Sequence, residues 1–210
     1  MTDIGSTGYM TDSQIMAWLE QKATDQYSNL GDQMTASEDR SKEIKALTDV
    51  RAAVDGGNPD DAFKQLDALR AAATDPKDQA FFLKEQIELL GWVQHGQTKA
   101  GALLATIDAS SLSGEEKQAL TDQINTEKGV MAKKDTNAST QENTDKHNQQ
   151  QKQVSGELDS RSQDLGRIDQ LALINIQQLV SDARQTDQLA SNILASRDQT
   201  NNAIVGNIRG

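Results

Sequence analysis

The carboxy-terminal quarter of the sequence most constrains the fold. No proline interrupts residues 154–208, and apolar or small residues recur there at steps of three and four, as in one face of a long helix. They lie at positions 158, 165, 168, 172, 176, 179, 183, 186, 190, 193, 200 and 204. A helix over this range would be roughly 80 Å long at 1.5 Å per residue. It must therefore pack along an element of comparable length.

Residues 12–54 are the one partner of that length within the chain. Their apolar residues also recur at helical spacing, and the run ends at Asp55-Gly56-Gly57-Asn58-Pro59, where glycines permit a left-handed stop and proline cannot continue the helix. The sequence predicts an elongated all-α protein whose long N- and C-terminal helices form an antiparallel coiled coil. We predict that coiled-coil or assembly contacts are made by Ile15, Leu19, Leu30, Ile44, Leu47, Leu165, Ile168, Ile176, Leu179, Ile193, Ile204 and Ile208.

The middle of the chain, residues 58–131, is predicted to form a small helical domain. Both prolines follow a capping residue, which predicts helices over 59–72 and 76–95, with Trp92 as the anchor of a local core. A further helix is expected around 100–107, and the capping box at Ser113-Gly114-Glu115-Glu116 opens another that runs to about 131. Residues 132–153 are polar, and they form either a helical extension or a flexible linker.

The long C-terminal helix carries more apolar side chains than one partner helix can cover. Seven of them fall off the main stripe: Leu171, Leu173, Ile174, Val180, Leu189, Leu194 and Val205. Either the middle helices of the same chain or another subunit must bury these side chains.

Composition excludes several functional classes. The chain has 21 Lys and Arg against 32 Asp and Glu, a net charge of −11, so we expect neither nucleic acid nor an anionic membrane surface as a partner. It has no cysteine, which removes thiol catalysis and thiolate metal sites. No stretch approaches the roughly 20 apolar residues that span a bilayer, so direct membrane insertion is not expected.

No motif specifies catalysis. His95 and His147 are the only histidines; the first is expected at a helix end and the second on an exposed surface, so neither predicts a metal site. The acid pairs Asp60-Asp61 and Glu115-Glu116 lie in first helical turns, where the helix dipole favours acids. We therefore predict no catalytic residue, no metal and no cofactor, and we interpret the chain as an assembly or interaction protein rather than an enzyme.

Two segments give the sequence a resemblance to a known family. The segment Ile15-Met16-Ala17-Trp18-Leu19-Glu20-Gln21 opens the first long helix, and the run from Gln170 to Leu179 continues to Ile208 in the second. With the polar start Met1–Thr11, this layout resembles the secreted needle-tip and tip-filament proteins of type III secretion systems, including the EspA-like filament subunits. The similarity covers the two long helices and is one of pattern.

The resemblance implies a secreted protein at the bacterial cell surface. Residues 1–11 would be a disordered, uncleaved secretion signal, and the protein would assemble with itself at the needle tip, as a cap or a filament. Its other partners would be the needle subunit, the translocator proteins and a dedicated cytosolic chaperone before export. The alternative is a cytosolic coiled-coil chaperone or adaptor that binds a partner helix.

Overall fold

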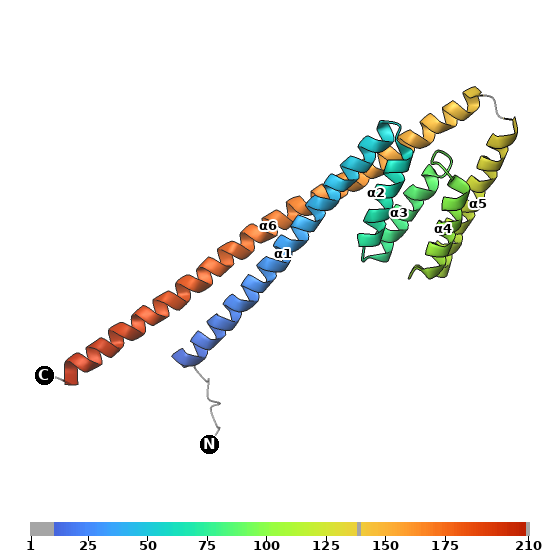
Figure 1. Cartoon of the computed structure of the whole chain (residues 1–210). Coiled ribbons are helices and arrows are strands. Elements are labelled where there is room, and N and C mark those ends of the chain that lie inside the picture. The colour runs from blue at the N-terminus through green and yellow to red at the C-terminus, as the bar shows by residue number, and fades with distance from the viewer. Residues whose placement is uncertain (1–10, 138–139, 209–210) are drawn as a thin grey trace, which may run out of the picture. The chain divides into compact units, whose positions relative to one another are not determined.

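A computed structural model describes residues 11–137 and 140–208, and every regular element in this part of the chain is an α-helix. The helices follow one another in Figure 1 as α1 (Asp12–Asp55), α2 (Pro59–Ala72), α3 (Pro76–Leu89), α4 (Gly96–Ala109), α5 (Gly114–Asn137) and α6 (Thr140–Ile208). The predicted fold class is confirmed: the protein is all-α, with two long terminal helices and a group of shorter helices between them in sequence. The predicted secretion signal at 1–11 lies outside the described residues except for Thr11.

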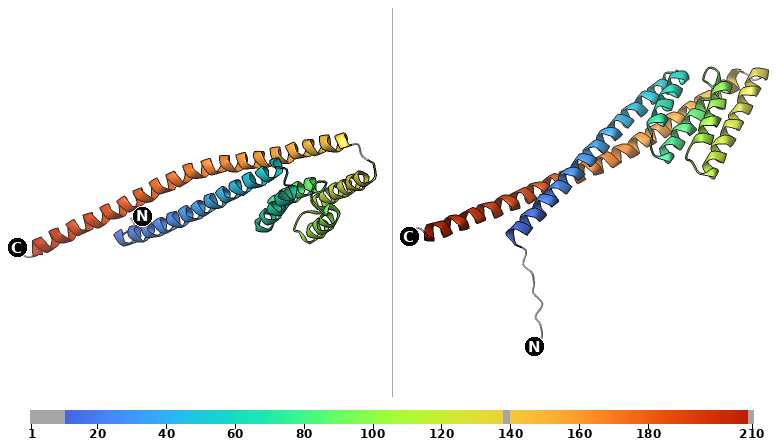
Figure 2. Two further views of the ribbon diagram at one scale, coloured as in Figure 1. Left: turned by 45° about the horizontal axis from the view of Figure 1, so that its top comes forward. Right: turned by 60° about the horizontal axis from the view of Figure 1, so that its bottom comes forward.

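The chain divides into two compact units, and both long helices contribute to each. The terminal unit comprises residues 1–39 and 168–210, and the helical unit comprises residues 40–167. The terminal unit thus contains the first part of α1 and the last part of α6. The helical unit contains α2 to α5 and the remaining parts of α1 and α6, and its short helices are seen side by side in both views of Figure 2.

The two long helices are antiparallel. In the terminal unit, Tyr27 contacts Asp187 and Ser37 contacts Asp169, so the residue number rises along α1 as it falls along α6. The helical unit shows the same direction, because Arg51 contacts Asp159 while Val54 contacts Gln151.

Two apolar clusters form the core of the helical unit. The first joins α1, α2, α3 and α6 around Leu47, Val50, Leu66, Phe82, Val154 and Leu158. The second joins α3, α4 and α5 around Leu83, Ile87, Leu103, Ile107 and Ile124. Helix α3 carries side chains into both clusters, so it is the central helix of this unit.

Side-chain caps open helices α3 and α5. Asp75 accepts a hydrogen bond from the backbone N–H of Lys77 (2.8 Å), and the reciprocal bonds between Ser113 and Glu116 form the predicted capping box. Gly57 has a φ of 72°, the left-handed conformation expected of a glycine at the end of a helix.

Several helix boundaries differ from the predicted ones. Helix α3 ends at Leu89 instead of 95, because the chain turns there and sends Leu90 into the second cluster and Val93 into the first. Helix α4 extends beyond the predicted 100–107 at both ends. The polar segment 132–153 is helical wherever it is described, since α5 continues to Asn137 and α6 begins at Thr140; only 138 and 139 lie outside the described residues.

Gly96 provides a test of the packing between α4 and its neighbours. A Cβ atom there would overlap the carbonyl oxygen of Leu90 and lie 2.7 Å from Sδ of Met131. We expect Gly96→Ala to lower the free energy of unfolding by about 1–3 kcal/mol, measured by urea denaturation. Gly101 on the same helix has no atom within 4 Å of the position that a Cβ would occupy, so Gly101→Ala should instead stabilise by about 0.5–1 kcal/mol. Equal effects of the two substitutions would contradict this packing.

Candidate functional site

The contact between α1 and α6 in the terminal unit follows two heptad rows on each helix. On α1, the first row is formed by Leu19, Gln26 and Gln33, and the second row by Met16, Ala23, Leu30 and Ser37. On α6, the first row is formed by Ala172, Leu179, Thr186 and Ile193, and the second row by Asp169, Ile176, Ala183 and Ala190. Every one of these side chains is buried or half-buried. Residues seven apart lie on one side of a helix, so these rows form the seam of a two-helix coiled coil.

Polar pairs interrupt this seam and set its register. The Thr186 hydroxyl donates to Oε1 of Gln26 (3.0 Å), and the Ser37 hydroxyl donates to Oδ1 of Asp169 (2.6 Å). A polar residue in the seam of a coiled coil fixes which residues face each other, at a cost in apolar burial. Helix α1 therefore presents only a narrow apolar surface to α6.

Much of the apolar surface of α6 is left uncovered as a result. The large side chains that fall off the predicted stripe are between 47% and 63% exposed: Leu171, Leu173, Ile174, Leu189, Leu194 and Val205. Only Val180 is half-buried. No described residue of the terminal unit covers this surface, which exceeds the few scattered apolar side chains expected on one soluble helix.

One side of the terminal unit combines apolar residues from both helices. The Tyr27 hydroxyl donates to Oδ2 of Asp187 (2.9 Å), which places the α1 row of Tyr27 and Met34 beside the α6 row of Asp187. Leu173, Val180 and Leu194 lie at multiples of seven from Asp187, so they share its side of α6. We call this side the Tyr27 face and define it as Tyr27, Met34, Leu173, Val180 and Leu194. All but Val180 are about half exposed.

The Tyr27–Asp187 bond is the polar contact at the centre of this face. A tyrosine is protonated at neutral pH, and the hydrogen bond to Asp187 raises the pKa of Tyr27 further. The bond thus holds the two rows together.

The opposite side of α1 is acidic. Trp18 lies there, 5.1 Å from the Nζ of Lys22, in a row that continues with Asp25, Asp32 and Asp39 at seven-residue steps. The two sides of α1 therefore differ in charge although both carry an exposed aromatic residue.

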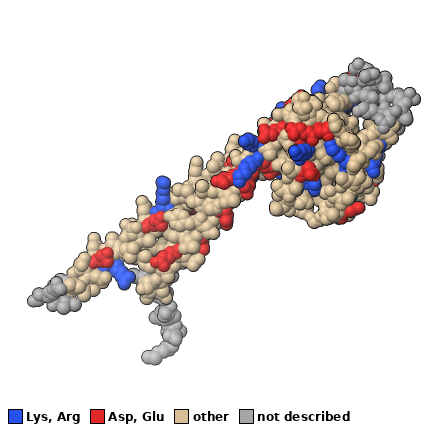
Figure 3. All heavy atoms as spheres, in the orientation of Figure 1, with Lys and Arg blue, Asp and Glu red and all other residues tan. Residues whose placement is uncertain are grey.

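Helix α6 is unusually poor in charge within the terminal unit. Residues 170–181 and 188–196 contain no Asp, Glu, Lys or Arg, although a quarter of the whole chain is charged. Figure 3 shows uncharged areas between the scattered charged side chains of this part of the molecule. Depletion of charged residues is typical of the buried centre of a protein interface.

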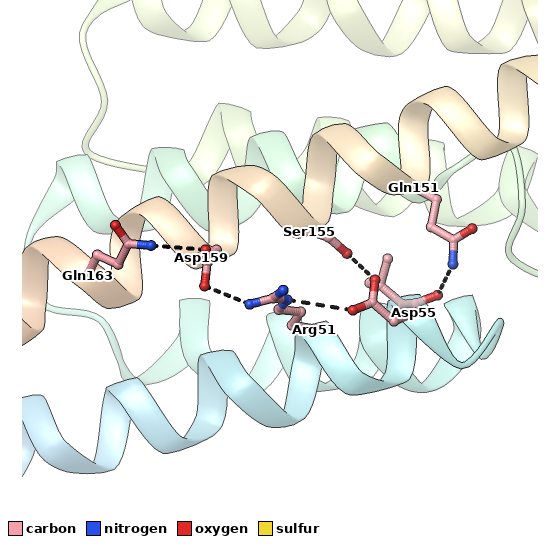
Figure 4. Close-up of polar contacts among 7 residues, drawn as sticks. Arg51, Asp55, Gln151, Ser155, Asp159 and Gln163 are labelled. Carbon is pink, nitrogen blue, oxygen red and sulfur yellow. Dashed lines mark hydrogen bonds and ion pairs between the residues drawn. The ribbon is translucent and has the colours of Figure 1, made fainter.

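In the helical unit, a polar clasp joins the end of α1 to α6 (Figure 4). Arg51 contacts Asp55 at 3.5 Å and Asp159 at 2.6 Å, and Ser155 donates to Asp55 at 2.6 Å. Gln151 Nε2 donates to the carbonyl oxygen of Val54 (2.7 Å), near the end of α1. The charged groups of the clasp satisfy one another, so we interpret it as a structural contact.

Arg161 links three helices of the same unit. Its guanidinium lies 2.7 Å from Glu43 on α1 and 2.7 Å from Asp78 on α3, and it stacks 5.2 Å from the ring of Phe81. Burial lowers the pKa of Arg161, but Glu43 and Asp78 raise it by more, so the guanidinium remains charged.

A buried acid on α3 lies beside other acids. Glu85 is fully buried, and its burial, followed by the neighbouring carboxylates of Glu157 and Glu88, raises its pKa to about 9. Lys84 pairs with Glu157 and so neutralises one of these neighbours. At neutral pH Glu85 is thus protonated and neutral.

The structure gives both histidines roles that differ from the expected ones. His95 is not at the carboxyl end of a helix: it precedes α4 as its N-cap, in the left-handed conformation (φ 57°), because α3 has already ended at Leu89. His147 is half-buried and stacks on Trp92 with ring centroids 4.0 Å apart, so it is not simply an exposed residue. Trp92 itself packs against the first cluster and donates to Gln150 (2.9 Å).

The described part of the chain holds no grouping of three or more His, Cys, Asp or Glu side chains suited to a metal ion. Among the described helices, none combines the length and apolar character needed to cross a membrane.

The predicted contact residues occupy different environments. Leu19, Leu47 and Leu165 are buried, and Ile15, Leu30, Ile44, Ile176, Leu179 and Ile193 are half-buried. Ile168 and Ile204 are about half exposed. Helix α6 ends at Ile208, whose side chain lies outside the described residues.

Sequence reasoning missed the Tyr27 face and the buried Glu85. The heptad spacing of Tyr27 with Met34, and of Leu173 with Val180 and Leu194, is visible in the sequence. The pairing of these two rows depends on the register of α1 against α6, which only the structure gives. No sequence pattern indicates that Glu85 is buried, because its position in the helix does not distinguish it from an exposed acid.

Comparison with protein-family models, with curated proteins and with solved structures finds no match to this chain. The function is therefore inferred from the geometry of the site.

Protonation of Glu85 makes the stability of the protein dependent on pH. Its pKa is about 9 in the folded chain and near 4.5 when exposed, so between these values the folded state binds a proton that the unfolded state lacks. The contribution of Glu85 is complete below pH 4.5 and is lost as the pH rises through 9, with a slope of at most about 1.4 kcal/mol per pH unit. We expect Glu85→Gln, which stays neutral, to flatten the fall in unfolding free energy between about pH 5 and 9.

The matched control is Glu115→Gln, which changes an exposed acid on α5. It should leave the pH dependence of urea unfolding as in the wild type. If Glu85→Gln gives the same slope as the wild type, Glu85 is ionised in the folded protein and its assigned environment is wrong.

Proposed function

We propose that this protein is a secreted structural protein that assembles at the tip of a type III secretion needle, as a cap or a filament, and connects the needle to the translocon. The observation that carries the proposal is the wide, uncharged apolar surface that α1 leaves exposed on α6. In this proposal the protein acts through assembly and has no catalytic role.

Burial of the exposed side chains would favour association. Complete burial of a Leu or Ile side chain contributes about 1.5–3 kcal/mol, so each half-exposed residue still offers roughly 1 kcal/mol. Leu173 and Leu194 lie in one heptad row of α6, so one partner helix could bury both of them, whereas Leu171 and Leu189 lie on other sides of the helix. Such a surface exposed in a cell would need masking, which is why we propose a dedicated chaperone before export.

The identity of the assembly rests on the resemblance of the terminal segments to needle-tip and tip-filament proteins. An all-α chain with two long, antiparallel terminal helices is compatible with that role. The needle subunit, the translocators and further copies of the chain are the proposed partners. The net charge of −11 argues against nucleic acid as an additional one.

The same exposed surface favours one other function. A cytosolic coiled-coil chaperone or adaptor would also present an uncovered apolar helix face, in that case to a client helix. The two functions differ in whether the protein leaves the cell.

Export therefore tests the proposal. We expect residues 1–20 fused to a reporter enzyme to carry it into the medium of a bacterium with an active type III system. The control is the same strain lacking the secretion ATPase, which should retain the fusion. Retention in both strains would favour the cytosolic adaptor.

A further inference from the structure

We propose that a proton shared between Glu85 on α3 and Glu157 on α6 fastens the beginning of α6 to α3. Loss of this proton as the pH rises opens the contact that residues 145–158 of α6, which we call the α6 start, make with α3 and α5. All of these residues belong to the helical unit, and the inference does not depend on the proposed function.

Neighbouring side chains place Glu157 against the turn of α3 that carries Glu85. Lys84, the residue before Glu85, forms an ion pair with Glu157. Gln153 donates to Glu157 (3.3 Å) and to Glu88 (2.9 Å), and Glu88 lies one turn after Glu85 on α3. Two carboxyl groups from different helices therefore meet where one of them, Glu85, is fully buried.

Glu85 needs a proton to make this contact. Neither of its carboxyl oxygens accepts a hydrogen bond from a donor among the described residues. A buried carboxylate without a donor is unfavourable, whereas a protonated carboxyl group donates to a neighbouring carboxylate. Burial favours the neutral form of Glu157, but hydrogen bonds from Glu85, Lys84 and Gln153 lower its pKa. At neutral pH Glu85 is therefore the donor and Glu157 the acceptor.

The other charged groups around the pair do not replace this proton. Lys84 is engaged by Glu157 and lies 3.9 Å from Glu88. Glu88 and, beyond it, Glu127 on α5 are themselves acids, and burial raises the pKa of both. Ionisation of Glu85 thus adds a buried negative charge beside Glu157 and Glu88, and α3 and α6 repel each other there.

The contact of the α6 start is the one that ionisation of Glu85 opens. Helix α3 is joined to α5 by the second apolar cluster, which this charge does not reach. In the α6 start, by contrast, Val154 and Leu158 are the only buried residues. Its first turns contact α3 and α5 through polar groups, since Gln150 donates to Glu127 (3.4 Å) and His147 stacks on Trp92. The polar clasp holds the α6 start on α1, so that contact persists.

Trp92 reports whether the contact is closed. Its indole stacks on His147 and donates to Gln150, and both residues belong to the α6 start. In the full chain with Trp18→Phe, Trp92 is the only tryptophan. We expect its emission to shift to longer wavelength between about pH 7.5 and 10, above the titration of histidine, with a midpoint near 9. Circular dichroism should show nearly unchanged helix content, because α2 to α5 stay folded.

Two isosteric substitutions in the Trp18→Phe chain test the shared proton. Glu85→Gln keeps a donor to Glu157 at every pH, so the emission shift should disappear. Glu157→Gln removes the neighbouring charge and supplies an amide donor to Glu85, so the midpoint should fall by at least about one pH unit. Glu115→Gln, which changes an exposed acid on α5, is the control and should keep the midpoint near 9.

Hydrogen exchange of the wild-type chain locates the opening. A helical segment that loses its packing frays, so peptides from the α6 start should lose protection as the pH rises through 9. Rates are first corrected for the intrinsic pH dependence of amide exchange. Peptides from α4, which packs into the second apolar cluster, are the internal control and should stay protected.

Three results would overturn the inference. The first is a Trp92 emission that does not shift between about pH 7.5 and 10. The second is a shift that persists in Glu85→Gln, or a midpoint that Glu157→Gln leaves unchanged. The third is loss of protection in α4 together with the α6 start, because the helical unit would then unfold as a whole. Export of the reporter fusion decides the proposed function separately.

Discussion

The mismatch between the two long helices is the constraint that shapes the terminal unit and gives it an open surface. Within this unit α6 carries apolar residues on several sides, while α1 offers it a seam that includes Gln26, Gln33 and Ser37. One helix cannot cover more than one stripe of another. The helical pair is therefore specific in register but incomplete in burial, and this incompleteness leaves apolar side chains of α6 exposed.

In the helical unit, by contrast, other helices cover the apolar side chains of α1 and α6. There α1 and α6 pack into an apolar cluster with α2 and α3, and Arg51 and Arg161 tie them together through carboxylates. The burial of Leu47 and Leu158 is nearly complete, so this unit has a conventional core. The same two helices thus contribute to a closed core in the helical unit and to an exposed apolar surface in the terminal unit.

The helices could be predicted well from the sequence because their signals are local. Prolines, caps and glycines mark the starts of α2, α3 and α5 and the end of α1, and each lies within a few residues of the boundary that it sets. The predicted end of α3 is wrong, since Leu90 and Val93 pack into two different clusters, and no local sequence pattern indicates such a tertiary contact.

The candidate site could be predicted only in part, for a related reason. The surplus of apolar residues on α6 follows from their spacing, and their exposure confirms that α1 does not cover them. The Tyr27 face and the burial of Glu85 depend on which residues of distant segments meet, and a single sequence fixes the period of each helix but not the register between two of them.

Whether the exposed surface of α6 drives self-assembly can be measured directly, as the mass of the purified chain at increasing concentration and neutral pH. Light scattering would follow the mass, and negative-stain electron microscopy of the same samples would show the form of any assembly. We expect the mass to rise with concentration to defined oligomers or filaments. A monomer at every concentration would mean that α6 does not provide a surface for self-assembly.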